Sequence, residues 1–137
     1  MKVLFDTNVY VAEALLGQAA EVMIRVTFEA RWRVYASRYL LEKLTRVLAE
    51  DLGFCRRLAI LSQRRIVRRS AIVEGGSSAE VPRDPKDSPI LQAALGCGAD
   101  YLVTNDRHLL SLDPFESLHI MSMSEYHQLL QQEGLLR

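Results

Sequence analysis

Short apolar runs recur along this chain of 137 residues, and segments with helical periodicity separate them. Each run has the length and composition of a strand buried in a parallel sheet. The predicted strands are KVLF (2–5), WRVYAS (32–37), AIVE (71–74), DYLVT (100–104) and LHIMS (118–122). Strands that alternate with helices predict an α/β fold in which helices cover both faces of a central parallel sheet. The length suits a single domain over residues 1–137.

Helical periodicity fills the intervals between these strands. In the segment that precedes the third strand, Phe54, Leu58 and Leu61 are expected to face the core. Ser122 and Glu125 have the spacing of a capping box, which predicts the start of the last helix. The predicted helical segments are 9–32 with a break at 17–18, 38–53, 54–69, 89–98, a short one at 109–112, and 124–134.

Composition limits the classes of protein to consider. No apolar run approaches the ~20 residues that a membrane-spanning helix requires. The start MKVLFDTN lacks the pattern of a signal peptide, so a cytoplasmic location is expected. Cys55 and Cys97 have no metal-ligand spacing, and we expect both to pack as small apolar side chains.

Charge is unevenly spread although the net charge is zero. Between Gly53 and Val73 there are arginines and no acids. Such a segment could contact RNA phosphates or an acidic partner, or could simply be a solvated helix face. The six arginines are Arg56, Arg57, Arg64, Arg65, Arg68 and Arg69.

Carboxylates stand where several predicted strands end. Asp6 ends the first strand, Asp106 follows the DYLVT strand, and Glu42 lies one turn into the helix after the second strand. Asp87 stands at the start of the helix that leads back to the sheet. Sites in open parallel sheets lie beyond the carboxyl ends of the strands, so these four acids can converge there. Each also has a simpler interpretation, as a helix cap, a turn residue or an exposed helix residue.

Convergence of the four acids would require a compensating charge. Two carboxylates about 5 Å apart repel by roughly 3 kcal/mol at an effective dielectric near 20. We expect no Lys or Arg to stand at a matching strand end and neutralise them. Mg²⁺ or Mn²⁺ suits an all-oxygen site with carboxylates, waters and substrate phosphate as ligands. The chemistry that follows is metal-assisted hydrolysis of phosphodiester bonds.

Several segments, in order along the chain, resemble the PIN domain. They are VLFDTNVYV, ASRYLLEKLTRVL, RDPKDSPILQAALGCGADYLVTNDRHLL and HIMSMSEYHQLL. The chain is most similar to small prokaryotic PIN proteins of the toxin type, relatives of the VapC toxins. The resemblance spans essentially the whole chain, and the helix at 54–69 contributes least to it.

The resemblance implies a Rossmann-like, three-layer α/β/α sandwich and a ribonuclease dependent on Mg²⁺ or Mn²⁺. The acidic quartet of the family maps onto Asp6, Glu42, Asp87 and Asp106, as catalytic residues and metal ligands. The expected activity is that of an endoribonuclease on single-stranded RNA, the toxin of a toxin–antitoxin pair. A small antitoxin and a second copy of the chain are the implied protein partners. The number of metal ions stays open.

Other polar residues receive secondary roles from the same resemblance. Asn8 and Thr104 match positions that support the acids or hold substrate and water, and Asp84 competes with Asp87 but is expected to support the loop. His108 is expected to be a bystander in catalysis.

Two other functions compete with the nuclease interpretation. A phosphatase of the haloacid-dehalogenase type also begins with a strand and an Asp, but the second acid of its motif is replaced here by Asn8. A catalytically silent PIN domain that binds RNA or a protein partner would be expected to have lost an acid of the quartet, and none is lost here.

Overall fold

A sheet of parallel strands forms the centre of the computed structural model, which describes residues 1–15, 17–74 and 88–137. The strands lie in the order β3-β2-β1-β4-β5, and every neighbouring pair is parallel. Their bounds are β1 Lys2–Phe5, β2 Arg33–Ser37, β3 Ala71–Val73, β4 Tyr101–Val103 and β5 His119–Met121.

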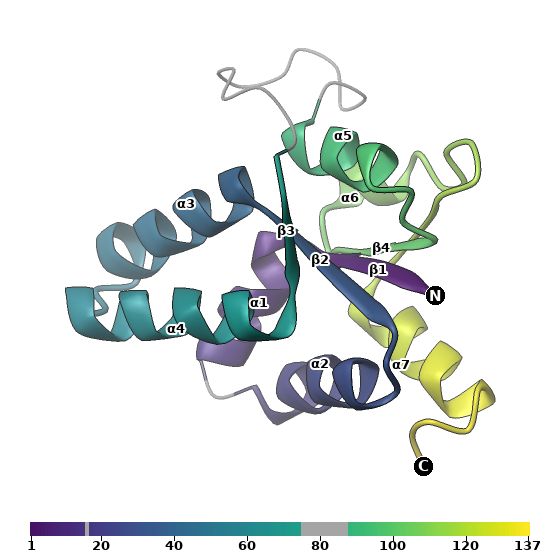
Figure 1. The fold of residues 1–137 in the computed structure, drawn as a ribbon, viewed down its shortest axis with the longest axis horizontal. Coiled ribbons are helices and arrows are strands. Elements are labelled where there is room, and N and C mark those ends of the chain that lie inside the picture. Colours follow the sequence, from purple (N-terminus) through teal and green to yellow (C-terminus); the bar gives the residue numbers. More distant parts are fainter. Residues whose placement is uncertain (16, 75–87) are drawn as a thin grey trace.

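Helices cover both faces of this sheet. Figure 1 shows α5 and α6 on one side of the strands and α1, α2 and α7 on the other. The predicted α/β fold with a parallel sheet is therefore confirmed. The helices are α1 Thr7–Ala14, α2 Gln18–Glu29, α3 Arg38–Arg46, α4 Arg56–Arg69, α5 Pro89–Gly96, α6 Arg107–Leu110 and α7 Met123–Gln132.

β1 occupies the middle of the sheet. Val3, Leu4 and Phe5 have no exposed surface, because strands flank β1 and helices cover it. Phe5 pairs with Val103 of β4, and the backbone N–H of Asp6 donates to the carbonyl of Val103 at 2.9 Å. This register brings the residues after β1 level with the residues after β4, at the carboxyl edge of the sheet.

Aromatic rings pack beside β1 and link α1 and α7 to it. The ring of Phe5 makes edge-on contacts with Tyr10 of α1 and with Tyr126 of α7, at centroid distances of 6.0 Å and 5.6 Å. The predicted capping box of Ser122 and Glu125 is present at the start of α7. α7 is therefore fixed both at its start and against the core.

Three local predictions were wrong. Leu58 and Leu61 of α4 are about half exposed, and the buried residues of this helix are Ala59 and Ile66. Figure 1 shows the first half of α4 extending beyond the sheet beside α3, so that only one face of it is covered. The predicted helix 38–53 changes at Val47–Asp51 into a π-helical turn. Cys55 is exposed, because it precedes the first turn of α4 on this extension.

No helix among the described residues is long and apolar enough to span a membrane.

Candidate metal centre at the carboxyl edge

Asp6 stands at the junction between β1 and α1. It is the N-cap of α1, and its Oδ1 accepts a hydrogen bond of 2.7 Å from the backbone N–H of Thr7. A helix N-terminus favours an anionic cap, which explains why a carboxylate follows the buried strand. Asp6 is only 6% exposed, so its carboxylate is held in a fixed position under the edge of the sheet.

Thr104 connects the two neighbouring strand ends. Its hydroxyl donates to Oδ2 of Asp6 at 2.7 Å and accepts from the backbone N–H of Asp106 at 3.0 Å. Thr104 is fully buried. The hydroxyl group of Thr104 therefore contacts the side chain of Asp6 and the backbone of Asp106, which brings the two acids close together.

Two asparagines extend this network. The side-chain amide of Asn8 donates to the hydroxyl of Thr104 at 3.3 Å, and its oxygen accepts from the backbone N–H of Asn105 at 3.4 Å. The side-chain oxygen of Asn105 accepts from the backbone N–H of Met123 at 3.2 Å. Asn8 and Thr104 thus share one hydrogen-bond network with Asp6, and Asn105 ties the loop to α7.

Asp106 is the more accessible acid of the pair. It is exposed and caps α6, where its Oδ1 accepts from the backbone N–H of His108 at 2.8 Å. The imidazole of His108 is exposed. His108 thus contacts Asp106 through the backbone N–H of His108. This contact requires no particular side chain at position 108.

The electrostatics of Asp6 reflect burial first. Desolvation raises the pKa of Asp6 above its ordinary value. Hydrogen bonds from Thr104 and Thr7 and the charge of Lys43 oppose this rise, and the charge of Asp106 adds to it. A buried carboxylate beside a second carboxylate is stabilised by a bound cation, so the site is suited to one.

The expectation that no Lys or Arg stands at a matching strand end is wrong, because Arg38 directly follows β2 and pairs with Glu74 at 2.8 Å. Lys43 is a second basic residue, and it affects Asp6 directly. It lies on α3, which starts where β2 ends, and its charge acts on Asp6. The strand-end argument missed Lys43 because the residue is a full turn into the helix.

The structure brings together only part of the expected quartet. Glu42 is exposed on α3, and Asp84 and Asp87 lie outside the described residues. Within residues 1–15, 17–74 and 88–137, no group of three or more His, Cys, Asp or Glu side chains is placed to hold a metal ion. Asp6 and Asp106 still fit a hard divalent cation, because Mg²⁺ binds through one or two carboxylates and keeps several waters.

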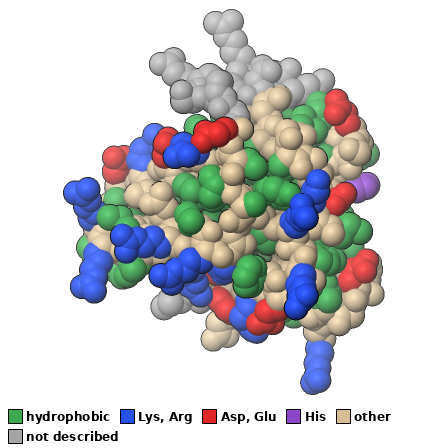
Figure 2. All heavy atoms as spheres, in the orientation of Figure 1, with side chains coloured by type: hydrophobic (Ala, Val, Ile, Leu, Met, Phe, Trp, Pro, Cys, Tyr) green, Lys and Arg blue, Asp and Glu red, His purple; other side chains and the backbone are tan. Residues whose placement is uncertain are grey.

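The arginines of α4 divide into two kinds. Arg69 binds Glu13 of α1 through two hydrogen bonds of 2.9 Å and 2.7 Å, and Arg65 lies 3.9 Å from the same carboxylate. Glu13 is buried, so Arg69 neutralises an internal charge. Arg56, Arg57, Arg64 and Arg68 are exposed. Figure 2 shows Lys and Arg side chains gathered over α4, with hydrophobic side chains among them.

The comparisons with known proteins agree with this geometry. The sequence model of the PIN domain family matches residues 2–108, a range that includes the edge with Asp6 and Asp106. The chain belongs to the PIN domain family. PIN domains are generally nucleases, and they typically use divalent metal ions. Neither the comparison with curated proteins nor the comparison with solved structures found a match.

Proposed function

We propose that this PIN domain is a metal-dependent endoribonuclease that hydrolyses phosphodiester bonds of single-stranded RNA. The observation that carries the proposal is the pair of acids, Asp6 and Asp106, that Thr104 connects at the carboxyl edge of the sheet. We further propose that Glu42 and Asp87 complete the acidic set, and that the cation is Mg²⁺ or Mn²⁺.

The residues of the chain have distinct tasks in this proposal. Asp6 and Asp106 would hold the cation directly or through water. When bound, a divalent cation stabilises charge on a phosphate and makes water a better nucleophile. Thr104 holds the Asp6 carboxylate in its orientation by donating to Oδ2, and Thr7 holds the other oxygen. Each oxygen thus keeps a second lone pair that could bind a cation.

Lys43 and Asn8 suit the binding of the substrate phosphate. The ammonium of Lys43 lies close enough to Asp6 to lower its pKa, so it can also attract a phosphate placed beside that acid. Asn8 is half-buried and supplies an amide within the same network. These groups position the phosphate, while the acids and the cation would carry the chemistry.

The role in a toxin–antitoxin pair is a separate proposal. It rests on the resemblance of the sequence to VapC-like proteins. It predicts growth arrest when the chain is expressed alone, and relief of that arrest by the product of an adjacent small gene. Expression without arrest, beside no small neighbouring gene, would refute this role and leave the nuclease proposal standing.

Cleavage of a mixed pool of single-stranded RNA, with Mn²⁺ or with EDTA, tests the nuclease proposal. We expect cleavage with Mn²⁺ and none with EDTA, and a large loss of rate in Asp6→Asn, Asp106→Asn and Asp87→Asn. Asp51→Asn is the matched control, because Asp51 is an exposed acid at the end of the π-helical turn, away from the strand ends. Retention of RNA without metal-dependent cleavage would instead support a PIN domain that acts as a binding module.

A further inference from the structure

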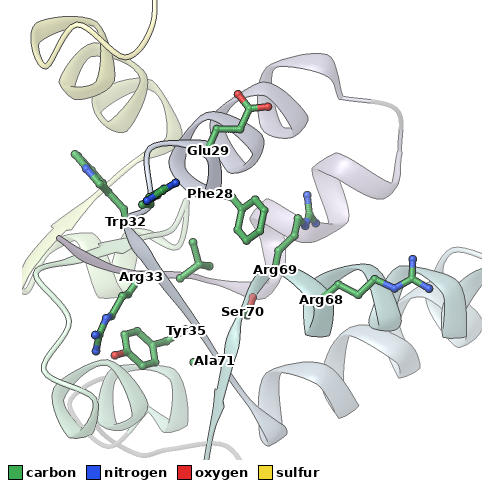
Figure 3. A pocket seen from close by; sticks show the side chains of 11 residues that line it. Phe28, Glu29, Trp32, Arg33, Tyr35, Arg68, Arg69, Ser70 and Ala71 are labelled. Atoms are coloured by element: carbon green, nitrogen blue, oxygen red, sulfur yellow. The ribbon is translucent and has the colours of Figure 1, made fainter.

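A groove lies at the opposite, amino-terminal edge of the sheet. It has a volume of about 680 Å³ and is formed where the end of α2, the start of β2 and the end of α4 meet. Figure 3 shows Phe28 over its middle with Arg69 beside it, Arg33 and Tyr35 on one side, and Arg68 on the other. Ala71, the first residue of β3, pairs with Tyr35 of β2. The residues of β2 before Tyr35 therefore have no partner in β3, and the start of β2 is open toward the groove.

Aromatic rings line this groove. Phe28 is 48% exposed, and Trp32 and Tyr35 are half-buried. One side of Trp32 stacks on Tyr101 at a centroid distance of 6.2 Å and an interplanar angle of 22°. The ring of Trp32 is therefore held in one orientation before any ligand arrives.

The charge of the groove is strongly positive. Arg31, Arg33 and Arg68 are exposed along it, while Arg69 is fixed from beneath by Glu13. Glu29 also lines the groove, and its carboxylate lies 3.7 Å from Arg25 of the preceding turn. Exposed arginines between flat rings form a surface for phosphates and bases.

Arg31 adds an observation from the backbone. It directly follows Ala30, the C-cap of α2, and has a φ of 62°, a left-handed conformation that glycine adopts with least strain. A side chain in this conformation costs about 1 kcal/mol relative to glycine. The arginine is thus kept where stability alone would favour glycine, at the rim of the groove.

We propose that this groove binds single-stranded RNA, with bases stacked on the rings and phosphates held by Arg31, Arg33 and Arg68. The inference rests on the proposed function, because the RNA in the groove would be the same substrate that is cleaved at the acidic edge. β2 runs from Arg33 at the groove to Ser37 at the acidic edge, which separates the two sites by about 13 Å along the strand. RNA bound in the groove would raise the local concentration of substrate at that edge.

Binding without cleavage provides the first test. Trp32 is the single tryptophan of the chain, so its fluorescence reports on the groove directly. We expect a short oligouridylate, added in EDTA, to quench it. The logarithm of the affinity should fall with the logarithm of salt concentration with a slope of about −2, because three arginine contacts contribute about −0.7 each on a single strand.

Variants separate this role from a structural one. Arg31→Gly should unfold at the same or higher urea concentration than the wild type, yet bind oligouridylate several-fold more weakly. Arg33→Gln should weaken binding and make the salt slope shallower by about 0.7. The Trp32 variants lack the fluorescent residue, so the fluorescence anisotropy of a dye-labelled oligouridylate measures their binding. Trp32→Ala should weaken binding about tenfold, since stacking on one ring is worth about 1–3 kcal/mol, whereas Trp32→Phe should retain it. Arg137→Gln, at the C-terminus, is the control for loss of one positive charge.

Several outcomes would overturn the proposal. The first is the absence of quenching, and the second is equal weakening of binding by Arg137→Gln and Arg33→Gln. The third is stronger competition for the groove by polyglutamate than by RNA, which would make the groove a surface for an acidic protein. Asp6→Asn should bind oligouridylate as the wild type does. If groove binding is absent but cleavage occurs, the groove proposal alone fails; if groove binding occurs without metal-dependent cleavage, the proposed function alone fails.

Discussion

Removal of the Thr104 hydroxyl should damage the candidate site without changing its shape. Thr104→Val replaces the hydroxyl by a methyl group of similar size in a fully buried position. The change removes the hydrogen bond to the Asp6 carboxylate and leaves the backbone N–H of Asp106 without this acceptor. The amide of Asn8 also loses an acceptor, but it is half-buried and can turn toward water.

The magnitude follows from these contacts. A hydrogen bond to a charged group contributes about 1.5–3 kcal/mol, and a partly buried N–H that loses its acceptor costs up to about 1 kcal/mol. We therefore expect Thr104→Val to lower the free energy of unfolding by about 2–4 kcal/mol at neutral pH. Thr104→Ser keeps the hydroxyl and loses one buried methyl group, at a cost of about 1 kcal/mol. Valine, although closer to threonine in size, should therefore be the more damaging replacement.

The cost of Thr104→Val should depend on pH. The hydrogen bond from Thr104 lowers the pKa of Asp6, which burial has raised, so its loss raises that pKa further. A carboxyl group with a raised pKa in the folded state binds protons there more tightly, and stability falls as pH rises through that pKa. Thr104→Val increases this fall, so its cost relative to the wild type is larger at neutral pH than in acid.

Urea unfolding followed by circular dichroism, in EDTA and at several pH values, measures these differences. Equal or smaller destabilisation by valine than by serine would refute the assigned role of the Thr104 hydroxyl. A cost of Thr104→Val that grows as the pH is lowered would refute the assignment of the pH dependence to Asp6.

Other predictions concern the packing of α4. Glu13→Gln should lower the free energy of unfolding by about 3 kcal/mol, because it leaves the guanidinium of Arg69 without its buried partner. Glu29→Gln, an exposed control on α2, should change it by less than about 0.5 kcal/mol. Ile66→Ala should cost about 2–5 kcal/mol and Leu61→Ala less than about 1 kcal/mol, since only the former is buried. Chemical unfolding measures all four, and equal costs at positions 61 and 66 would contradict the orientation of α4.

The strands and the acids at their ends could be predicted because they depend on local patterns. β1 is flanked by strands and covered by helices, so its sequence is a continuous apolar run, and the acid after it is also the cap of the next helix. The positions of Asp6 and Asp106 at one edge followed from parallel strands alone. Thr104 was placed beside them by resemblance, but its contact with both acids depends on the register of β1 and β4.

Other features depend on tertiary contacts that local patterns do not record. The spacing of apolar residues in α4 predicted that Leu58 and Leu61 face the core. In the structure the helix extends past the sheet, and its buried residues are Ala59 and Ile66. The pairing of Glu13 with Arg69 joins residues 56 apart, so no spacing rule could reveal it. The groove likewise combines α2, β2 and α4, which only the fold brings together.

The rate of cleavage of a labelled single-stranded RNA, measured against Mn²⁺ concentration for the wild type and Asp6→Asn, tests the central claim most directly. The account predicts a saturable rise in rate with Mn²⁺ for the wild type, complete loss of activity with EDTA, and a rate lower by orders of magnitude in Asp6→Asn at every Mn²⁺ concentration. Cleavage that is independent of Mn²⁺, or an Asp6→Asn curve that overlays that of the wild type, would contradict it.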